Sequence, residues 1–178
     1  MPTRIRRCRM IVAGLFCIIM THACALDLST DVASFNVTSN SMSPAFEAGD
    51  TVVAEMHVNP NRLKRGDIIL MASLKKDGKL WPKRIIAVTG DRIGFHHGRI
   101  VLNGEYLDEP YVAQENNLET ALKFDVTDER TVPKDHFCVL GDNRDHSYDC
   151  KDFGMIHRSH IRGKIVSVQN RRMLSQKN

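Results

Sequence analysis

Apolar residues in this chain form one long run near the N-terminus and shorter segments after it. The long run, residues 10–26, contains no Asp, Glu, Lys or Arg. As a helix, its 17 residues would span about 25 Å, slightly less than a bilayer core of roughly 30 Å. After Leu26, short segments rich in β-branched residues alternate with Gly, Asp, Asn and Pro. The pattern therefore predicts one N-terminal apolar helix followed by a mostly β body.

The body contains several segments whose pattern predicts strands, at residues 51–58, 68–71, 80–89, 92–95, 99–102, 106–107, 137–140 and 161–168. Residues 112–132 are polar and weakly patterned, so we expect a loop or an exposed excursion there. Short strands separated by turn residues favour an all-β or mostly β fold over alternating βαβ units.

The composition suits one globular domain, because 178 residues with 42% hydrophobic and 26% charged positions can form a core. It excludes a disordered tail, a coiled coil and a polytopic membrane protein. The net charge of +4 is unevenly distributed along the chain. Residues 1–9 carry four arginines and no acid, residues 10–156 carry a net −6, and residues 157–178 carry six bases and no acid. A nucleic-acid-binding protein is expected to spread its positive charge over a folded face, so we expect no nucleic-acid partner.

The N-terminal arginines and the apolar run together predict an export signal. Residues 1–9 form a cytoplasmic basic region, and residues 10–26 are either a cleavable signal sequence ending at Ala23-Cys24-Ala25 or a retained signal anchor. Both alternatives carry residues 27–168 out of the cytoplasm as one domain, followed by a basic tail at residues 169–178. The sequence leaves open whether the leader is retained or cleaved.

Two cysteines, Cys138 and Cys150, lie in the exported part of the chain. An oxidising compartment allows a disulfide between them. The sequence does not establish that their Cα atoms lie close enough, so two unpaired, packed thiols are an equal alternative.

Three polar clusters are candidates for chemistry, although each also has an ordinary structural interpretation. Ser41 lies in the run Ser39-Asn40-Ser41-Met42-Ser43-Pro44, where a serine is usually a turn residue. Lys83 lies among apolar strand residues, where an inward-pointing amine would have a lowered pKa and an outward-pointing one would stay solvated. Residues 141–149, GDNRDHSYD, follow an apolar strand and are typical of a solvated loop or of a hydrogen-bonded support.

Together, in this order and behind an export leader, the clusters resemble the sequence boxes of the type I signal peptidases, which are membrane-bound serine proteases. Ser41-Met42-Ser43-Pro44 is similar to the nucleophile box, and Lys83-Arg84 with Gly90-Asp91 is similar to the lysine box. Residues 141–149, followed by Phe153-Gly154, are similar to the third box. The resemblance covers roughly residues 37–164. It implies a mostly β catalytic domain with a signal-peptidase-like or LexA-like fold, preceded by one N-terminal apolar helix.

The resemblance also implies roles for individual residues. Ser41 would be the nucleophile and Lys83, as a neutral amine, its general base, because Ser–Lys is a recognised variant of the serine-protease constellation. Ser39 would donate to the oxyanion beside the Ser41 backbone N–H, and Ser147 would orient the lysine amine. The other polar residues of the third box are expected to be structural supports: Asp142, Asn143, Arg144, Asp145 and Asp149. No CxxC, HExxH or P-loop pattern occurs, so we expect no metal and no cofactor.

Two positions depart from the family pattern, which usually has Ser and then Arg after the last aspartate of the third box. Cys150 and Lys151 stand there instead. Since lysine offers a point charge where arginine pairs bidentately, an ion pair between Lys151 and Asp149 would be a weaker support.

By resemblance, the chain is a serine endopeptidase that removes signal peptides from exported precursors with Ala-x-Ala-like cleavage sites. It would act on the outer, periplasmic side of the cytoplasmic membrane, with membrane lipid as a further partner. The leader's own Ala23-Cys24-Ala25 fits this specificity, so self-processing is a hypothesis. An alternative within the family is a dedicated peptidase for one substrate, such as a pilin precursor of a conjugation or secretion system. Residues 4–26 argue against a cytoplasmic self-cleaving repressor, and an exported β-domain that only binds partners is a further alternative.

Overall fold

Strands make up most of the computed structural model, which describes residues 31–75, 77–117, 119–120 and 126–169. The strands are β1 (Val32–Asn36), β2 (Thr51–Met56), β3 (Ile68–Ala72), β4 (Leu80–Val88), β5 (Arg92–His96), β6 (Arg99–Leu102), β7 (Glu105–Tyr106), β8 (Val126–Thr131), β9 (His136–Leu140), β10 (Ile156–His157) and β11 (Ile161–Gln169). They are accompanied by a short helix, α2 (Cys150–Phe153), and by 3-10 turns at Pro60–Arg62, Gln114–Asn116 and Arg158–His160. The prediction of a mostly β fold is confirmed.

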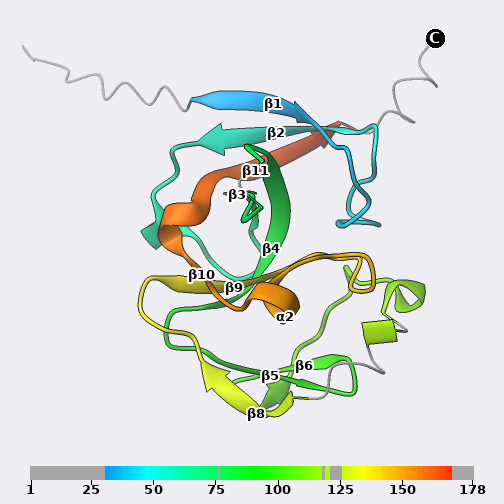
Figure 1. The fold of residues 1–178 in the computed structure, drawn as a ribbon, viewed down its shortest axis with the longest axis vertical. Helices are drawn as coiled ribbons and strands as arrows, with labels where there is room; N and C mark the ends of the chain where they lie inside the picture. Colours follow the sequence, from blue (N-terminus) through cyan, green and yellow to red (C-terminus); the bar gives the residue numbers. More distant parts are fainter. Residues whose placement is uncertain (1–30, 76, 118, 121–125, 170–178) are drawn as a thin grey trace, which may run out of the picture.

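The strands form two antiparallel sheets. The larger sheet has the order β1-β2-β11-β3-β4-β9-β10, and the smaller has the order β7-β6-β5-β8. In Figure 1 the β1–β2–β11 part of the larger sheet lies at the top of the view and the smaller sheet at the bottom, with β9, β10 and α2 between them. The late strand β11 inserts between β2 and β3, so residues far apart in sequence are joined in one sheet.

Strand β4 connects the apolar clusters of the two sheets. It pairs with β3 on one side and with β9 on the other, and its pairing with β9 shifts register between Ile85 and Ala87. A bulge of this kind bends the strand and re-aims its side chains. Ile85 accordingly packs with residues of β3 and β9, whereas Ile86 packs with residues of β5 and β6. Lys83, two residues before the bulge, is therefore carried by a strand that contributes to both clusters.

The expectation of a loop or exposed excursion across residues 112–132 is wrong in part. Residues Val126–Thr131 form β8, which pairs with β5 at the edge of the smaller sheet. An edge strand has one partner and is commonly polar, so its sequence, VTDERT, lacks the alternation that marks a half-buried strand. The same reason applies to β1, an edge strand of the larger sheet that the apolar pattern did not predict.

The predicted N-terminal features lie outside the described residues. These are the basic region at residues 1–9 and the apolar helix of the signal or anchor at residues 10–26. Residues 170–178 of the basic tail also lie outside the described residues. Within the described ranges between residues 31 and 169, no helix has both the length and the apolar character that crossing a membrane requires.

Candidate active site

Ser41 lies in the turn that connects β1 to β2. The neighbouring Met42 anchors this turn, because its side chain is fully buried and packs with Phe46 and Val52 against β2, β3 and β11. The Ser41 carbonyl oxygen accepts a hydrogen bond of 3.1 Å from the backbone N–H of Asn143, in the loop that follows β9. Ser41 is thus held by packing on one side and by a backbone hydrogen bond on the other.

Lys83 reaches Ser41 from β4. Its register partner on β3 is the fully buried Ile69, and the Lys83 side chain is itself buried, at 3% exposure. Its Nζ lies 3.3 Å from Ser41 Oγ. The structure therefore brings together the two residues that the sequence proposed as nucleophile and base, although they lie 42 positions apart.

Burial changes the protonation of this amine. It lowers the pKa of Lys83 from 10.5 to about 8, because the charged ammonium loses the water that would stabilise it. Asp149 opposes this shift in the pKa of Lys83, Lys151 reinforces it, and Asp142 and Asp152 oppose it more weakly. A substantial share of the Lys83 amines is then neutral close to physiological pH and able to accept the Ser41 hydroxyl proton.

Two further serines lie near this pair in different environments. Ser39 is exposed, and its Oγ is 3.4 Å from Ser41 Oγ. Ser147 Oγ is buried and has no hydrogen-bond partner among the described residues. The expected hydrogen bond from Ser147 to the Lys83 amine is therefore absent there, and the contact that this amine makes is the one with Ser41 Oγ. Ser147 still lies at the site, because a Cβ on Gly141 would be 2.2 Å from Ser147 Oγ and 2.4 Å from the Ser41 carbonyl oxygen.

The loop at residues 141–149 is joined to the lysine strand by a buried ion pair. Asp142 is fully buried and accepts hydrogen bonds from Arg84 Nε at 2.8 Å and Nη2 at 2.6 Å. The Arg84 guanidinium also lies over the ring of Tyr111, 4.2 Å from its centroid. A bidentate pair with a stacked guanidinium fixes both position and orientation. Since Arg84 follows Lys83 directly, the pair fixes the loop relative to the lysine strand.

Other residues of the same loop form contacts that hold its shape. Arg144, at 2% exposure, donates to Glu109 at 3.0 and 2.5 Å and to the Gly141 carbonyl at 3.1 Å. The Asp145 carboxylate accepts the backbone N–H of Thr120 at 2.7 Å. Together with the hydrogen bond from the Asn143 N–H to the Ser41 carbonyl, these contacts hold the loop in place around Ser41 and Lys83.

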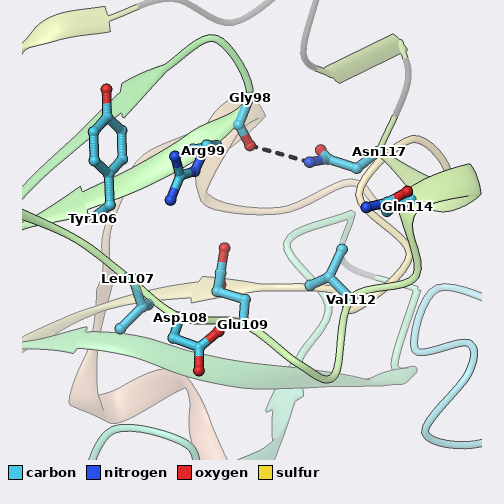
Figure 2. A pocket seen from close by; sticks show the side chains of 9 residues that line it. All are labelled: Gly98, Arg99, Tyr106, Leu107, Asp108, Glu109, Val112, Gln114 and Asn117. Carbon is cyan, nitrogen blue, oxygen red and sulfur yellow. Dashed lines mark hydrogen bonds between the residues drawn. The ribbon is translucent and has the colours of Figure 1, made fainter.

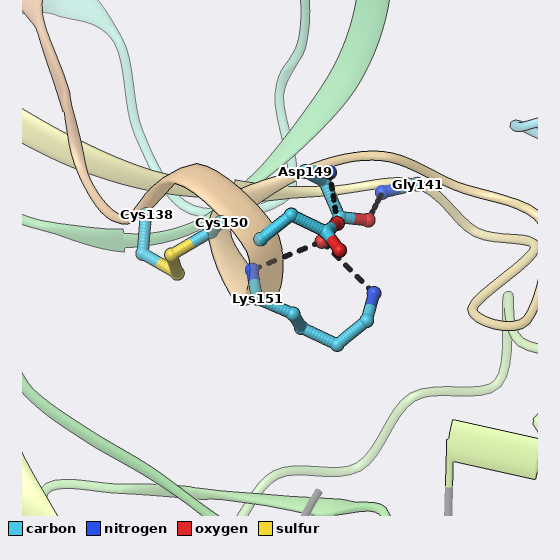
Figure 3. The surroundings of a disulfide bond; sticks show 6 residues. Cys138, Gly141, Asp149, Cys150 and Lys151 are labelled. Atoms are coloured by element: carbon cyan, nitrogen blue, oxygen red, sulfur yellow. Dashed lines mark hydrogen bonds and ion pairs between the residues drawn. A yellow bond between two sulfur atoms is a disulfide. The ribbon is translucent and has the colours of Figure 1, made fainter. Parts of the chain in front are cut away.

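Asp149 and a disulfide close the loop (Figure 3). The fully buried Asp149 accepts the backbone N–H of Gly141 at 3.0 Å and the Nζ of Lys151 at 2.9 Å, and it also caps the N-terminus of α2. The ion pair that the sequence suggested for Lys151 is thus formed. Cys138 and Cys150 are joined by a disulfide with their Cα atoms 5.6 Å apart, so of the two alternatives for these cysteines the structure has the paired one.

A cavity of about 580 Å³ lies away from the Ser41–Lys83 pair, between the β6–β7 strands and residues 107–117 (Figure 2). Arg99, Asp108 and Asn117 are among its lining residues. Glu109 also lines it and at the same time holds Arg144. The cavity is therefore connected to the candidate site through a supporting ion pair and not through a catalytic side chain.

Sequence reasoning did not identify Glu109 and Tyr111 as parts of the support. They lie in the stretch Leu107-Asp108-Glu109-Pro110-Tyr111, which resembles a less diagnostic part of the signal peptidases and was given no role, and Glu109 is 35 positions from Arg144. One signal was available, because an arginine in a hydrogen-bonded support is expected to have a carboxylate partner when it is buried. The acids of the third box were more obvious candidates than an acid from another segment.

Comparisons with known proteins agree on one family. The family model described as signal peptidase, peptidase S26, matches residues 8–169. A signal peptidase I from Leptolyngbya laminosa is 32% identical over 167 residues, which cover 88% of this chain and 78% of that protein. A signal peptidase I from Bacillus caldolyticus is 33% identical over 141 residues, which cover 75% of this chain and 76% of that protein.

Among solved structures, the chain is similar to a crystal structure of a signal peptidase I from Enterococcus faecalis. The match has 25% sequence identity and a TM-score of 0.46, and it covers 60% of this chain and 97% of that one.

Proposed function

Because the chain belongs to the peptidase S26 family of signal peptidases, we propose that it removes signal peptides through an acyl-enzyme on Ser41, with Lys83 as general base. Membership of this family makes the chain a serine endopeptidase of the signal peptidase I type. The observation that carries the residue assignment is the 3.3 Å separation between Ser41 Oγ and the buried Lys83 Nζ.

The first half of the reaction forms the acyl-enzyme. The neutral Lys83 amine takes the proton of the Ser41 hydroxyl while Oγ attacks the scissile carbonyl carbon. The resulting oxyanion accepts hydrogen bonds from the Ser41 backbone N–H and the Ser39 hydroxyl. The 3.4 Å separation of the Ser39 and Ser41 hydroxyl oxygens is compatible with this role. When the tetrahedral intermediate collapses, the Lys83 ammonium returns its proton to the leaving amine.

The second half releases the signal peptide. Lys83, neutral again, takes a proton from water as the water oxygen attacks the ester carbonyl, and Ser41 leaves with that proton. Both halves require the amine to alternate between its two protonation states. A pKa of about 8 for Lys83 supports this cycle, because neither state is then strongly disfavoured near neutral pH.

The substrate we propose is an exported precursor whose residues before the cut are of the Ala-x-Ala type. It would bind in extended form and add a strand beside the catalytic strands. The catalytic domain would lie on the outer side of the cytoplasmic membrane, with the arginines of residues 1–9 in the cytoplasm and residues 10–26 in lipid. The charge asymmetry of the N-terminal segment supports this orientation.

The dyad is tested by substitution in the detergent-solubilised full chain, with cleavage of a precursor followed by gel and mass spectrometry. Ser41→Ala removes the nucleophile and is expected to reduce kcat at least about 1,000-fold. Lys83→Arg keeps a positive charge but supplies no neutral amine, so it is expected to be equally inactive. Lys79→Ala is the matched control, because Lys79 lies just before β4 with its side chain in solvent, and its activity should equal that of the wild type.

Wild-type rates for either Ser41→Ala or Lys83→Arg would contradict the dyad assignment. If the wild type itself leaves the precursor uncut while it is correctly folded, the proposed substrate class is wrong.

A further inference from the structure

The Cys138–Cys150 disulfide encloses the loop that supports the site. Cys138 lies in β9, Cys150 is the first residue of α2, and 12 positions separate them. The loop between them contains Ser147 and all five residues interpreted above as structural supports: Asp142, Asn143, Arg144, Asp145 and Asp149. The disulfide therefore fixes both ends of the segment that surrounds Ser41 and Lys83.

Cys150 stands between the two members of a buried ion pair. Asp149 precedes it and Lys151 follows it, with side-chain exposures of 0% and 2%. Lys151 Nζ is 2.9 Å from one Asp149 carboxylate oxygen, and the other accepts the backbone N–H of Gly141 at 3.0 Å. Figure 3 shows the disulfide on one side of the first turn of α2 and the Lys151–Asp149 contact beside it. Because the Gly141 N–H holds the Asp149 carboxylate from the end of β9, a displacement of Cys150 would draw Lys151 away from that carboxylate.

The charges that act on Lys83 come mainly from this region. Asp149, Lys151 and Asp152 belong to the first turn of α2 and its cap, and Asp142 belongs to the same loop. Asp142 is already paired with Arg84, the neighbour of Lys83 on its own strand. Ile69, the register partner of Lys83 on β3, is apolar, and so is Leu140, which pairs with the neighbouring Arg84 on β9.

Asp152 is also engaged, because its carboxylate accepts the Asp149 backbone N–H at 2.8 Å. Among these carboxylates Asp149 has the largest effect on Lys83, and Lys151 is the cation paired with Asp149. If Lys151 moved away from Asp149, the negative charge of the Asp149 carboxylate would no longer be offset, and it would favour the protonated form of Lys83.

We propose that Lys151, held in place by the Cys138–Cys150 disulfide, is a positioning residue for Lys83 because it offsets the charge of the Asp149 carboxylate, to which it is paired at 2.9 Å. The inference rests on the proposed role of Lys83 as general base. It makes the activity sensitive to thiols, although neither cysteine takes part in bond cleavage.

The first test measures the pH profile of kcat for variants of Lys151. Lys151→Met removes the charge with similar bulk, so the midpoint is expected to rise by at least about half a pH unit and the rate at pH 7 to fall at least about 3-fold. Lys151→Arg keeps the charge and should keep the wild-type midpoint. The double variant Asp149→Asn/Lys151→Met removes both charges, and its midpoint should return toward the wild-type value. A merely structural role would not give this return.

The second test needs no substitution at the site. A dithiol such as dithiothreitol gives two electrons and two protons to the Cys138–Cys150 bond, which yields two thiols, and the dithiol becomes a cyclic disulfide. The reduced enzyme is expected to show the same upward shift of the midpoint as Lys151→Met, and reduction of Lys151→Met should add no further shift. A variant with Cys8, Cys17 and Cys24 changed to Ser is the control, and it should respond to reduction like the wild type.

The outcomes separate this inference from the proposed function. If the oxidised wild type cleaves the precursor with a rising pH profile but neither Lys151→Met nor reduction moves the midpoint, the inference is overturned and the dyad stands. The inference is likewise overturned if the reduced enzyme has a lower melting temperature but an unchanged midpoint of its pH profile, because the disulfide would then have a structural role only. If the oxidised wild type does not cleave at all, the proposed function fails first.

Discussion

At the scale of single residues, the feature that decides the chemistry is the burial of Lys83. A lysine in water has a pKa near 10.4 and is almost fully protonated at neutral pH. The pKa of Lys83 is lowered to about 8 because its amine is enclosed by β3, β4 and the loop after β9. The same enclosure keeps Nζ within 3.3 Å of the Ser41 hydroxyl. Position and proton affinity thus have one common cause.

We predict that activity rises with pH as Lys83 loses its proton, with a midpoint near 8. The pKa is lowered, so the neutral amine prevails above about pH 8 and its share falls about tenfold for each pH unit below. The value of kcat/KM at pH 6 is therefore expected at about one hundredth of its plateau. Steady-state cleavage of a precursor peptide from pH 6 to pH 9 measures this profile.

The exposed Lys79 again provides the comparison, because Lys79→Ala should leave the midpoint unchanged. A flat profile between pH 6 and pH 9 would show that no lysine titrates in the rate-limiting step.

Short-range patterns made some residues of the site predictable and others not. Ser41 and Lys83 are recognisable because each stands in a short run with several specified positions, and the structure brings them together. The state of Ser147 was not predictable, because the direction of a buried hydroxyl depends on atoms from several segments. The partnership of Glu109 with Arg144 joins distant segments and leaves no periodic trace in the sequence.

At the scale of elements, apolar alternation predicted the central strands and failed at the edges. Strands β3, β4 and β9 have neighbours on both sides, and their sequences are rich in Ile, Leu and Val. Strands β1 and β8 lie at sheet edges and contain exposed polar residues, so periodicity gives no signal for them. The helix α2 has four residues, too few for any helical period to appear in the sequence.

The loop after β9 depends on its ion pairs, and this leads to a prediction about stability. Glu109→Gln keeps the size of the side chain but leaves the Arg144 guanidinium, at 2% exposure, without its carboxylate. Breaking a buried pair by removing one partner costs about 3–5 kcal/mol of unfolding free energy. Denaturant unfolding is expected to show this loss, and kcat should fall with it because Arg144 also holds the Gly141 carbonyl.

The partly exposed pair of Arg158 and Asp135 supplies the matched control. Its two side chains are 34% and 37% exposed, and Asp135→Asn is the same carboxyl-to-amide change. Solvent screens such a pair, so the denaturation midpoint should stay within error of the wild type. Equal losses for Glu109→Gln and Asp135→Asn would mean that burial does not set the importance of the Arg144 pair.

At the scale of the whole molecule, the distribution of charge carries the topological argument. The body at residues 10–156 has a net −6, and several of its buried charges are paired within the fold, as in Arg84–Asp142 and Lys151–Asp149. The excess of basic residues lies at the two ends of the chain. Basic residues next to an apolar run favour the cytoplasmic side, which supports a catalytic domain on the opposite side of the membrane.

We predict that the full-length chain stays in the membrane with its leader attached. An apolar run in lipid is held by burial of hydrocarbon, which high salt does not weaken. Attachment through the six basic residues of the C-terminal segment alone would be screened and washed away. The protein should therefore resist a high-salt wash, and intact-mass spectrometry of the membrane fraction should give a chain that begins at Met1 or Pro2.

Cleavage after Ala25 would contradict this prediction, and the small residues of Ala23-Cys24-Ala25 match the proposed cleavage specificity. Ala25→Leu places a large residue immediately before the potential cut and should give the same N-terminus as the wild type. A wild-type chain that begins at Leu26, together with an uncut Ala25→Leu chain, would show that the leader is removed. Ser41→Ala then shows which enzyme removes the leader, because self-processing stops in this variant whereas cleavage by another peptidase continues.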